Sequence, residues 1–213
     1  MNAVVVANGE IVPAARVLEC WQRADLRVAA NGGTRHARLY LETPPHLAVG
    51  DLDSMDAATR GWLEQHGVEF VTYPRAKSAT DLELALELAR TRGADELTVL
   101  GAFGGRVDHW LANVMLLTRY PRVVLLDASN EMWVGSGDEV IRGRRGDVLS
   151  LIPLDEQVVG VETDELEYPL RRETLARGST RGISNVLLGE RARVRWTSGM
   201  LLLVHHWQEN GLF

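Results

Sequence analysis

The sequence is poor in the residues that define several classes of protein. Its single cysteine, Cys20, excludes an intramolecular disulfide and a cysteine-rich zinc site. No apolar run approaches the roughly 18 residues of a membrane span, and the first residues, MNAVVVANGE, lack the basic region of a secretory signal. We therefore expect a cytoplasmic protein with no membrane partner.

Positive charge is also scarce, with 23 Lys and Arg residues against 29 Asp and Glu residues and a formal net charge of -6. An acidic chain has no overall attraction for nucleic acid or anionic lipid, so we expect no nucleic-acid partner. A polyanionic ligand would need metal ions held by carboxylates, or a few placed cations. The remaining composition, 46% hydrophobic and 24% charged, is ordinary for a globular protein with a substantial core.

The first part of the chain alternates between short apolar runs and helical patterns. The apolar runs are rich in Val and Leu, as strands covered on both faces tend to be. This repetition predicts an α/β fold, with a mostly parallel sheet and helices on both faces. The predicted strands are 3–7, 26–30, 47–49, 68–72, 97–100 and 123–126, and the predicted helices lie around 13–24, 34–41, 57–66, 80–92 and 106–118.

From about Ser129 onward, glycines separate short alternating segments. This pattern predicts a small antiparallel β-sandwich or barrel. The clearest strand patterns lie at 148–152, 158–163, 192–196 and 200–205. With the boundary near 127–131 and no long linker, we expect two domains, 1–128 and 129–213.

A first candidate site is the acidic segment GDLDS at 50–54. Side chains two residues apart on an extended chain point the same way, so Asp51 and Asp53 can face one ion, roughly 6–7 Å apart at Cα. A few hard oxygen ligands suit Mg²⁺, and parallel sheets bind ligands at the carboxyl ends of their strands. The alternative is an Asp-rich turn before a helix capped by Ser54 or Asp56.

A second candidate is the start of the helix predicted around 80–92. Thr80 and Glu83 form a capping-box pattern, which explains both residues structurally. Asp81, in the first turn, either complements the helix dipole or supplies a third carboxylate at the mouth of the sheet.

The most informative segment is GAFGGRVDHWLAN at 101–113. A glycine-rich turn between strand and helix aims free backbone amides at a phosphate, although this one is neither a Walker A loop nor G-x-G-x-x-G. An Arg in the first helical turn is disfavoured by about 0.3–1 kcal/mol, so a bound anion would explain Arg106. Singly, a solvated Arg106, a capping Asp108 and a surface His109 are ordinary, but together after a glycine turn they indicate a site. The helix has an apolar face with Val107, Trp110, Leu111 and Val114, and Arg106, His109 and Asn113 gather beside it.

In the second predicted domain, the segment GSTRGISN at 178–185 is rich in small hydroxyl and amide residues. Such groups can approach a small polar ligand closely, or they can simply form a polar hairpin loop. Tyr168, which precedes Pro169, is either a stacking surface or an edge-strand residue.

Taken together, these segments resemble the thiamine pyrophosphokinase (thiamine diphosphokinase) family. The resemblance implies an N-terminal α/β catalytic domain that binds ATP, a C-terminal β-sandwich that binds thiamine, and a homodimer with active sites between subunits. The implied reaction uses Mg²⁺ and transfers pyrophosphate from ATP to the thiamine hydroxyl, which gives thiamine diphosphate and AMP. The segments that carry it are VVVANGE at 4–10, AANGG at 29–33, GDLDS at 50–54, TDLELAL at 80–86, GAFGGRVDHWLAN at 101–113, LEYPL at 166–170 and STRGISN at 179–185.

The resemblance also implies roles for individual residues. The catalytic and metal-binding set is Asp51, Asp53 and Asp81. The ATP-binding set is Asn31, Gly32, Gly33, Gly50, Gly104, Gly105, Arg106, Asp108, His109 and Asn113. The thiamine-binding set is Tyr168, Ser179, Thr180, Ser184 and Asn185.

The chain departs from the family pattern at Asn31 and Ser78, where the family usually carries aspartates. Each change removes a carboxylate near the metal and triphosphate, which predicts a lowered or altered metal affinity. Two rival functions follow. One is a related pyrophosphokinase with another acceptor alcohol, such as a pterin, against which STRGISN and Tyr168 argue. The other is a catalytically silent nucleotide- or thiamine-binding regulator, which the two departures motivate.

Overall fold

The structure is a computed structural model that describes residues 1–53, 55–74, 76 and 78–208. The chain divides into two compact units, Met1–Ala128 and Ser129–Phe213. Within the described ranges, no helix has the length and apolar character needed to cross a membrane.

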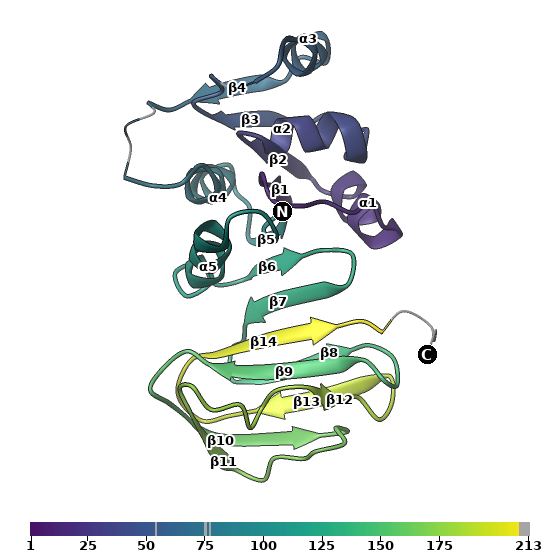
Figure 1. The fold of residues 1–213 in the computed structure, drawn as a ribbon, viewed down its shortest axis with the longest axis vertical. Coiled ribbons are helices and arrows are strands. Elements are labelled where there is room, and N and C mark those ends of the chain that lie inside the picture. Colours follow the sequence, from purple (N-terminus) through teal and green to yellow (C-terminus); the bar gives the residue numbers. More distant parts are fainter. Residues whose placement is uncertain (54, 75, 77, 209–213) are drawn as a thin grey trace. The chain divides into compact units, whose positions relative to one another are not determined.

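The first unit is built on six parallel strands in the order β6-β5-β1-β2-β3-β4 (Figure 1). The chain runs outward from β1 to β4 and then returns to β5 on the other side of β1. The ends of β1 and β5 therefore form the topological switch point, where open α/β sheets bind ligands. The strands are β1 (Asn2–Val6), β2 (Leu26–Ala30), β3 (Leu47–Gly50), β4 (Glu69–Thr72), β5 (Glu96–Leu100) and β6 (Val123–Leu126), all close to their predicted bounds.

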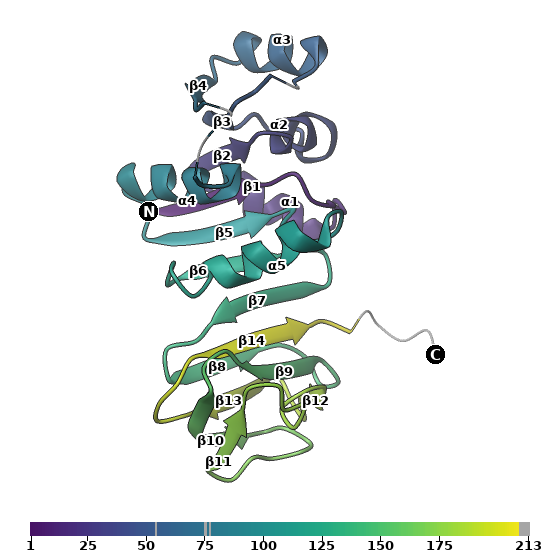
Figure 2. The same ribbon diagram turned by 60° about the vertical axis from the view of Figure 1, so that its left-hand side comes forward.

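Helices cover both faces of this sheet, as predicted. On one face lie α1 (Ala15–Gln22), α2 (Gly33–His36) with its π-helical continuation η1 (Ala37–Leu41), and α3 (Ala57–Gln65). On the other face lie α4 (Asp81–Thr91) and α5 (Val107–Leu116), side by side in both views (Figures 1 and 2). The helix α4 buries Leu82, Ala85, Leu86 and Ala89, the spacing of one helical face.

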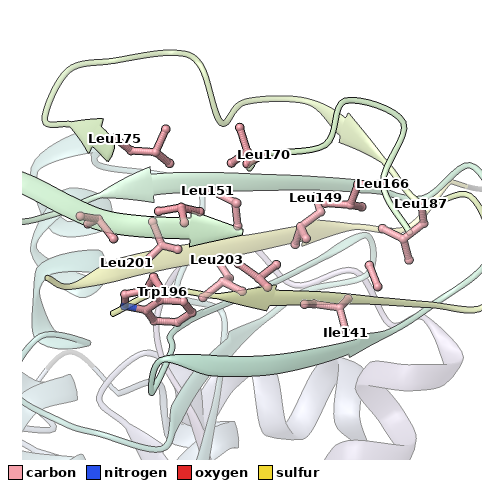
Figure 3. Close-up of a cluster of buried hydrophobic side chains, with 14 residues drawn as sticks. Ile141, Leu149, Leu151, Leu166, Leu170, Leu175, Leu187, Trp196, Leu201 and Leu203 are labelled. Atoms are coloured by element: carbon pink, nitrogen blue, oxygen red, sulfur yellow. The ribbon is translucent and has the colours of Figure 1, made fainter. Parts of the chain in front are cut away.

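The second unit consists of two antiparallel layers, with strand orders β12-β9-β14-β7 and β11-β10-β13-β8. Leucines of β9 and β14 and Trp196 meet in a buried core between the layers (Figure 3). The predicted β-sandwich is therefore confirmed. Its strands are β7 (Asn130–Val134), β8 (Asp138–Arg142), β9 (Val148–Pro153), β10 (Gln157–Asp164), β11 (Glu173–Ala176), β12 (Asn185–Val186), β13 (Arg191–Arg195) and β14 (Leu201–His206).

Candidate functional site

A cavity of about 440 Å³ opens at the carboxyl ends of β1, β2 and β5. Its position at the switch point of the parallel sheet matches the general rule for ligand sites in this architecture. The lining comes from three strand ends, the glycine turn after β5, the start of α4 and the first two turns of α5. It comprises Ala7, Asn8, Gly9, Ala30, Asn31, Thr80, Asp81, Leu82, Gly101, Ala102, Gly104, Gly105, Arg106, His109, Trp110 and Asn113.

Asn31 brings two of the candidate carboxylates together. Its Nδ2 donates to Oδ1 of Asp51 at 3.2 Å and to Oδ2 of Asp81 at 3.0 Å. Its backbone N–H donates to the Val49 carbonyl at 2.7 Å, and its carbonyl accepts from the Thr34 N–H and hydroxyl. The φ angle of Asn31 is 46°, in the left-handed region that Asn tolerates better than most residues. The strand end therefore presents this amide in one fixed orientation.

Gly50 makes this convergence possible. A Cβ atom at Gly50 would lie 3.0 Å from Oδ1 of Asp81 and 3.2 Å from the Cβ of Asn31, and its φ angle is 141°. A side chain there would have to displace Asp81 or Asn31 by a few tenths of an ångström and would hold a φ angle that L side chains rarely adopt, so glycine fits this position best.

Asp53 does not join this pair. The expectation that Asp51 and Asp53 face the same way assumed an extended chain, but the intervening Leu52 is buried and has a φ angle of 53°. Asp53 is exposed as a result. Among the described residues, no three His, Cys, Asp or Glu side chains gather closely enough to hold a metal ion. Of the three expected carboxylates, the structure therefore brings together Asp51 and Asp81.

Two helix caps position the acidic residues. The Thr80 hydroxyl accepts from the Glu83 N–H at 3.2 Å, which begins α4 so that Asp81 lies in its first turn and lines the cavity. Asp56 accepts from the Thr59 N–H at 2.8 Å and caps α3. Both predicted caps are confirmed, whereas Ser54, the alternative cap of α3, lies outside the described residues.

The glycine turn after β5 packs on the turn after β1. The Gly9 N–H donates to the Gly101 carbonyl at 2.7 Å, and a Cβ at Gly9 would lie 2.2 Å from the Phe103 carbonyl oxygen. Gly104 and Gly105 have φ angles of 77° and 65°, which favour glycine. A Cβ at Gly105 would meet nothing within 4 Å, so the backbone there borders open space. The turn is thus anchored on one side and accessible on the other.

Arg106 begins α5 and lines the cavity beside this turn. Its Nε donates to Oδ1 of Asp108 at 3.1 Å, and this contact lowers the pKa of the Asp108 carboxyl and raises that of the Arg106 guanidinium. Asp108 also accepts from the His109 N–H at 2.9 Å, while the His109 side chain lines the cavity. Asp108 therefore orients the cation and does not itself line the cavity.

The orientation of α5 differs from the one expected. Asn113 is buried and its Nδ2 donates to the Ala102 carbonyl at 2.9 Å, so this side of the helix faces the glycine turn. Val107 and Leu111, on the predicted apolar face, are 67% and 51% exposed, so this part of the face does not pack on the sheet. The buried amide sets the rotation of α5, and Val107, Leu111 and Met115 form an exposed apolar stripe.

Gly32, which precedes α2, and Gly33, its first residue, occupy tightly packed positions. Gly33 is buried, and a Cβ there would lie 2.1 Å from the Val6 carbonyl oxygen, so it lets α2 approach β1. Gly32 borders an adjacent cavity of about 210 Å³ that shares Asn8 and Asn31 with the larger one. Asn8 and Gly9 line the main cavity but were not among the candidate residues. A strand followed by an Asn-Gly turn at the same sheet edge is the signal that could have found them.

The candidate residues of the second unit belong to a loop and a short strand. The Ser179 hydroxyl accepts from the Arg181 N–H at 3.2 Å, and Arg181 pairs with Glu173. Ser184 has a φ angle of 58°, and its N–H donates to the Ser150 hydroxyl at 3.0 Å. The loop is therefore fixed at both ends.

The remaining candidates of this unit differ in exposure. Thr180 is exposed, and Tyr168 is 54% exposed. Asn185 is buried in β12, so its side chain has little access to solvent or ligand.

Two protein-family models match the chain, one within each of the two compact units. Residues 17–125 match the family "Thiamin pyrophosphokinase, catalytic domain", and residues 139–201 match "Thiamin pyrophosphokinase, vitamin B1 binding domain". Thiamine pyrophosphokinase of Bacillus subtilis is 30% identical over 166 residues, which cover 75% of this chain and 78% of that protein. Thiamine pyrophosphokinase 1 of Oryza sativa is 26% identical over 93% of this chain and 85% of its own length.

Solved structures of relatives have the same fold over nearly the full length of this chain. The crystal structure of the Bacillus subtilis thiamine pyrophosphokinase has a TM-score of 0.86 and 26% identity, and covers 98% of this chain and 100% of that one. That of the Geobacillus thermodenitrificans protein has a TM-score of 0.85 and 27% identity, with 100% of both chains covered. With both family regions in order and relatives matched along its length, the chain belongs to the thiamine pyrophosphokinase family of enzymes.

Proposed function

We propose that this enzyme transfers pyrophosphate from ATP to the hydroxyl of thiamine and releases thiamine diphosphate and AMP. The observation that carries the proposal is the cavity at the switch point, which an accessible glycine turn and Arg106 line together with Asp81 and Asn31. Backbone amides and a guanidinium are suited to phosphate oxygens, and a carboxylate pair is suited to a cation. These features match the demands of a metal-bound polyphosphate.

The triphosphate of ATP is assigned to the glycine turn. Gly105 offers backbone next to open space, and Arg106 supplies a permanent positive charge held by Asp108. His109 adds a ring nitrogen to the cavity wall, and Asn113 keeps the turn in place through the Ala102 carbonyl. Gly32 and Asn31, beside the adjacent cavity, are assigned to the rest of the nucleotide, with Gly33 and Gly50 providing the close packing behind them.

The donor chemistry at Asp51 and Asp81 fits Mg²⁺. Both carboxylates lie within hydrogen-bond distance of one Asn31 nitrogen, so their oxygens converge on a small region. Hard oxygen atoms in small number are the ligands that Mg²⁺ accepts, with water and phosphate completing its shell. When bound, Mg²⁺ would neutralise charge on the phosphates during transfer. Asp53 is exposed and does not converge with this pair in the structure. We propose that it joins the same ion as a third carboxylate when the backbone at Leu52 turns its side chain toward Asp51.

The reaction requires positioning more than covalent chemistry by the protein. The thiamine oxygen attacks the β-phosphorus, the bond from that phosphorus to the oxygen bridging to the α-phosphate breaks, and AMP leaves with the bridging oxygen. A loose transition state needs little prior deprotonation of the alcohol, so a carboxylate, Asp81 or Asp53, suffices to accept the hydroxyl proton. Arg106 stabilises the negative charge that shifts during the transfer.

Thiamine is assigned to residues 129–213. Tyr168 offers an exposed aromatic ring, and such a ring attracts a cationic heterocycle such as the thiazolium of thiamine. Ser179, Thr180 and Ser184 supply hydroxyl groups on a loop whose ends are fixed. Asn185 belongs to the same segment.

We further propose a homodimer with active sites between subunits, in the cytoplasm where ATP is supplied. The exposed stripe of Val107, Leu111 and Met115 supports an association surface, because three apolar side chains on one helix face would lose contact with water on pairing. Sedimentation of the purified protein tests the dimer.

One assay separates this function from its rivals. The protein is incubated with ATP, Mg²⁺ and thiamine, and the products are resolved by chromatography. AMP and thiamine diphosphate in equal amounts support the proposal. AMP without thiamine diphosphate would indicate another acceptor alcohol. Ligand binding without AMP would indicate a catalytically silent regulator, a hypothesis that rests on the loss of the family aspartates at Asn31 and Ser78.

A further inference from the structure

Asn185 and Tyr168 are joined by a pair of hydrogen bonds that the transfer step does not use. Oδ1 of Asn185 accepts from the Tyr168 N–H at 2.9 Å, and its Nδ2 donates to the Tyr168 carbonyl at 2.7 Å. The Asn185 side chain is buried at 5% exposure, whereas Tyr168 is 54% exposed. One buried amide therefore binds both backbone groups of an exposed aromatic residue.

This arrangement extends the pairing of β12. The Glu167 N–H donates to the Val186 carbonyl at 2.9 Å, and Leu166 forms a bridge with Leu187. A side-chain amide carries the same donor and acceptor as a peptide group, so Asn185 supplies the next two bonds in place of backbone.

Two further features restrain Asn185 and Tyr168. Oδ1 of Asn185 also accepts from the Val186 N–H at 3.0 Å, which fixes the orientation of the amide. On the other side, Pro169 has no N–H and disfavours helical conformations of the residue before it. The backbone of Tyr168 is therefore restrained from both sides.

The neighbours of Tyr168 anchor its chain in the core. Leu166 and Leu170 are both buried among the leucines of the sandwich (Figure 3). Leu166 and Leu170 are anchored in the core, and the hydrogen bonds from Asn185 restrain the backbone between them. The Tyr168 side chain is therefore directed toward solvent. A residue whose backbone is already restrained loses less conformational freedom when a ligand stacks on its ring.

We propose that Asn185 is a positioning residue, which holds the backbone of Tyr168 so that its ring is presented to the cationic heterocycle of the acceptor. This inference rests on the proposed function, in which thiamine binds to residues 129–213. It gives Asn185 a role other than the direct thiamine contact that the family resemblance implies. The physical reason is that the side-chain oxygen and nitrogen of Asn185 are buried and already form hydrogen bonds with the Tyr168 backbone.

The test is a double-mutant cycle on the full-length enzyme. Asn185→Ala removes both bonds, and we expect the KM for thiamine to rise about tenfold, which corresponds to about 1.4 kcal/mol. The kcat at saturating thiamine and the KM for ATP should stay within about twofold, since neither depends on a ring that only binds the acceptor. Tyr168→Ala should raise the KM for thiamine by at least as much, and adding Asn185→Ala to it should produce no further rise.

Two other variants keep the test interpretable. Asn185→Asp retains the acceptor for the Tyr168 N–H but places an oxygen that cannot donate against the Tyr168 carbonyl, so it should also raise the KM for thiamine. It tests the positioning role if the alanine variant fails to fold. Asp155→Ala is the matched control, because Asp155 also makes a side-chain bond to backbone in this unit, accepting from the Met200 N–H at 2.8 Å. It should lower the melting temperature without changing the KM for thiamine.

The outcomes separate a failure of the positioning role from a failure of the proposed function. A wild-type KM for Tyr168→Ala would contradict the assignment of thiamine to that ring. A raised KM for Tyr168→Ala with wild-type values for both Asn185 variants would overturn only the positioning role. Additive effects in the double variant would also overturn it, because they would mean that Asn185 contacts the substrate independently.

Discussion

Replacing Asn31 by aspartate would test whether Asp51 and Asp81 form a metal-binding site. In the structure, the Asn31 amide donates to Asp51 at 3.2 Å and to Asp81 at 3.0 Å. Asn31→Asp exchanges this donor for a third negative charge at the same place. Both hydrogen bonds become repulsive contacts, while the left-handed backbone of residue 31 remains accessible to aspartate.

The magnitude follows from the distances. Two unit charges about 4 Å apart repel by about 1 kcal/mol in water and by about 4 kcal/mol at an effective dielectric constant of 20. Because all three side chains are half-buried and there are two such pairs, we expect the unfolding free energy without metal to fall by about 3 kcal/mol. A loss of this size lowers the melting temperature by roughly 6–12 °C for a chain of this length.

The assay is thermal unfolding with and without Mg²⁺, combined with calorimetric titration of Mg²⁺–ATP. For Asn31→Asp, Mg²⁺ at about 100 times its Kd should restore about 2.7 kcal/mol, and the variant should bind metal at least as tightly as the natural protein. Asn31→Gly is the control, since it removes the side chain without adding charge or backbone strain. Weaker metal binding by Asn31→Asp, or no destabilisation without metal, would refute this reasoning.

Three further predictions address other residues. Asp53→Asn should lower kcat by about 100-fold or more with an unchanged melting temperature, the scale for removing one group that stabilises transition-state charge; a nearly active variant would contradict its assignment to the metal. Arg106→Ala should raise the KM for ATP about tenfold, the effect of one lost charge-assisted contact, and leave that for thiamine unchanged. Its control, Arg92→Ala, breaks an exposed ion pair with Glu69 in the same unit and should leave both KM values unchanged; a similar KM in both variants would exclude a specific role for Arg106. Partial burial raises the pKa of the Cys20 thiol, so iodoacetamide at pH 8 should alkylate the native protein more slowly than the urea-unfolded chain, and equal rates would be inconsistent with a half-buried thiol.

The order of elements in the first unit could be predicted because its strands are buried on both faces. Val123–Leu126 is apolar throughout and Leu26–Ala30 is interrupted only by Arg27, and such short runs have no other simple explanation in a chain with regular helical patterns between them. The strands β7, β8, β11 and β12 were not predicted. β12 is only Asn185–Val186, and β8 carries charged residues at Asp138 and Arg142, so neither has a distinctive apolar pattern.

The candidate site was predictable in its residues but not in its geometry. The spacing of GDLDS indicated Asp51 and Asp53, and the family resemblance added Asp81, but the left-handed conformation of Leu52 turns Asp53 away from the pair. The same limit applies to α5, where helical periodicity gave an apolar face but not its direction. A single buried bond from Asn113 to the Ala102 carbonyl decides that direction, and local periodicity does not contain it.

The central claim is that ATP binds at the switch point of the parallel sheet, with its metal at Asp51 and Asp81. The most direct test is a crystal structure with Mg²⁺, thiamine and α,β-methylene ATP, whose modified linkage blocks the release of AMP. We predict metal density about 2.0–2.1 Å from oxygens of Asp51 and Asp81, and the triphosphate against Gly104, Gly105 and Arg106. A triphosphate bound elsewhere, or a metal without contact to either carboxylate, would contradict the account.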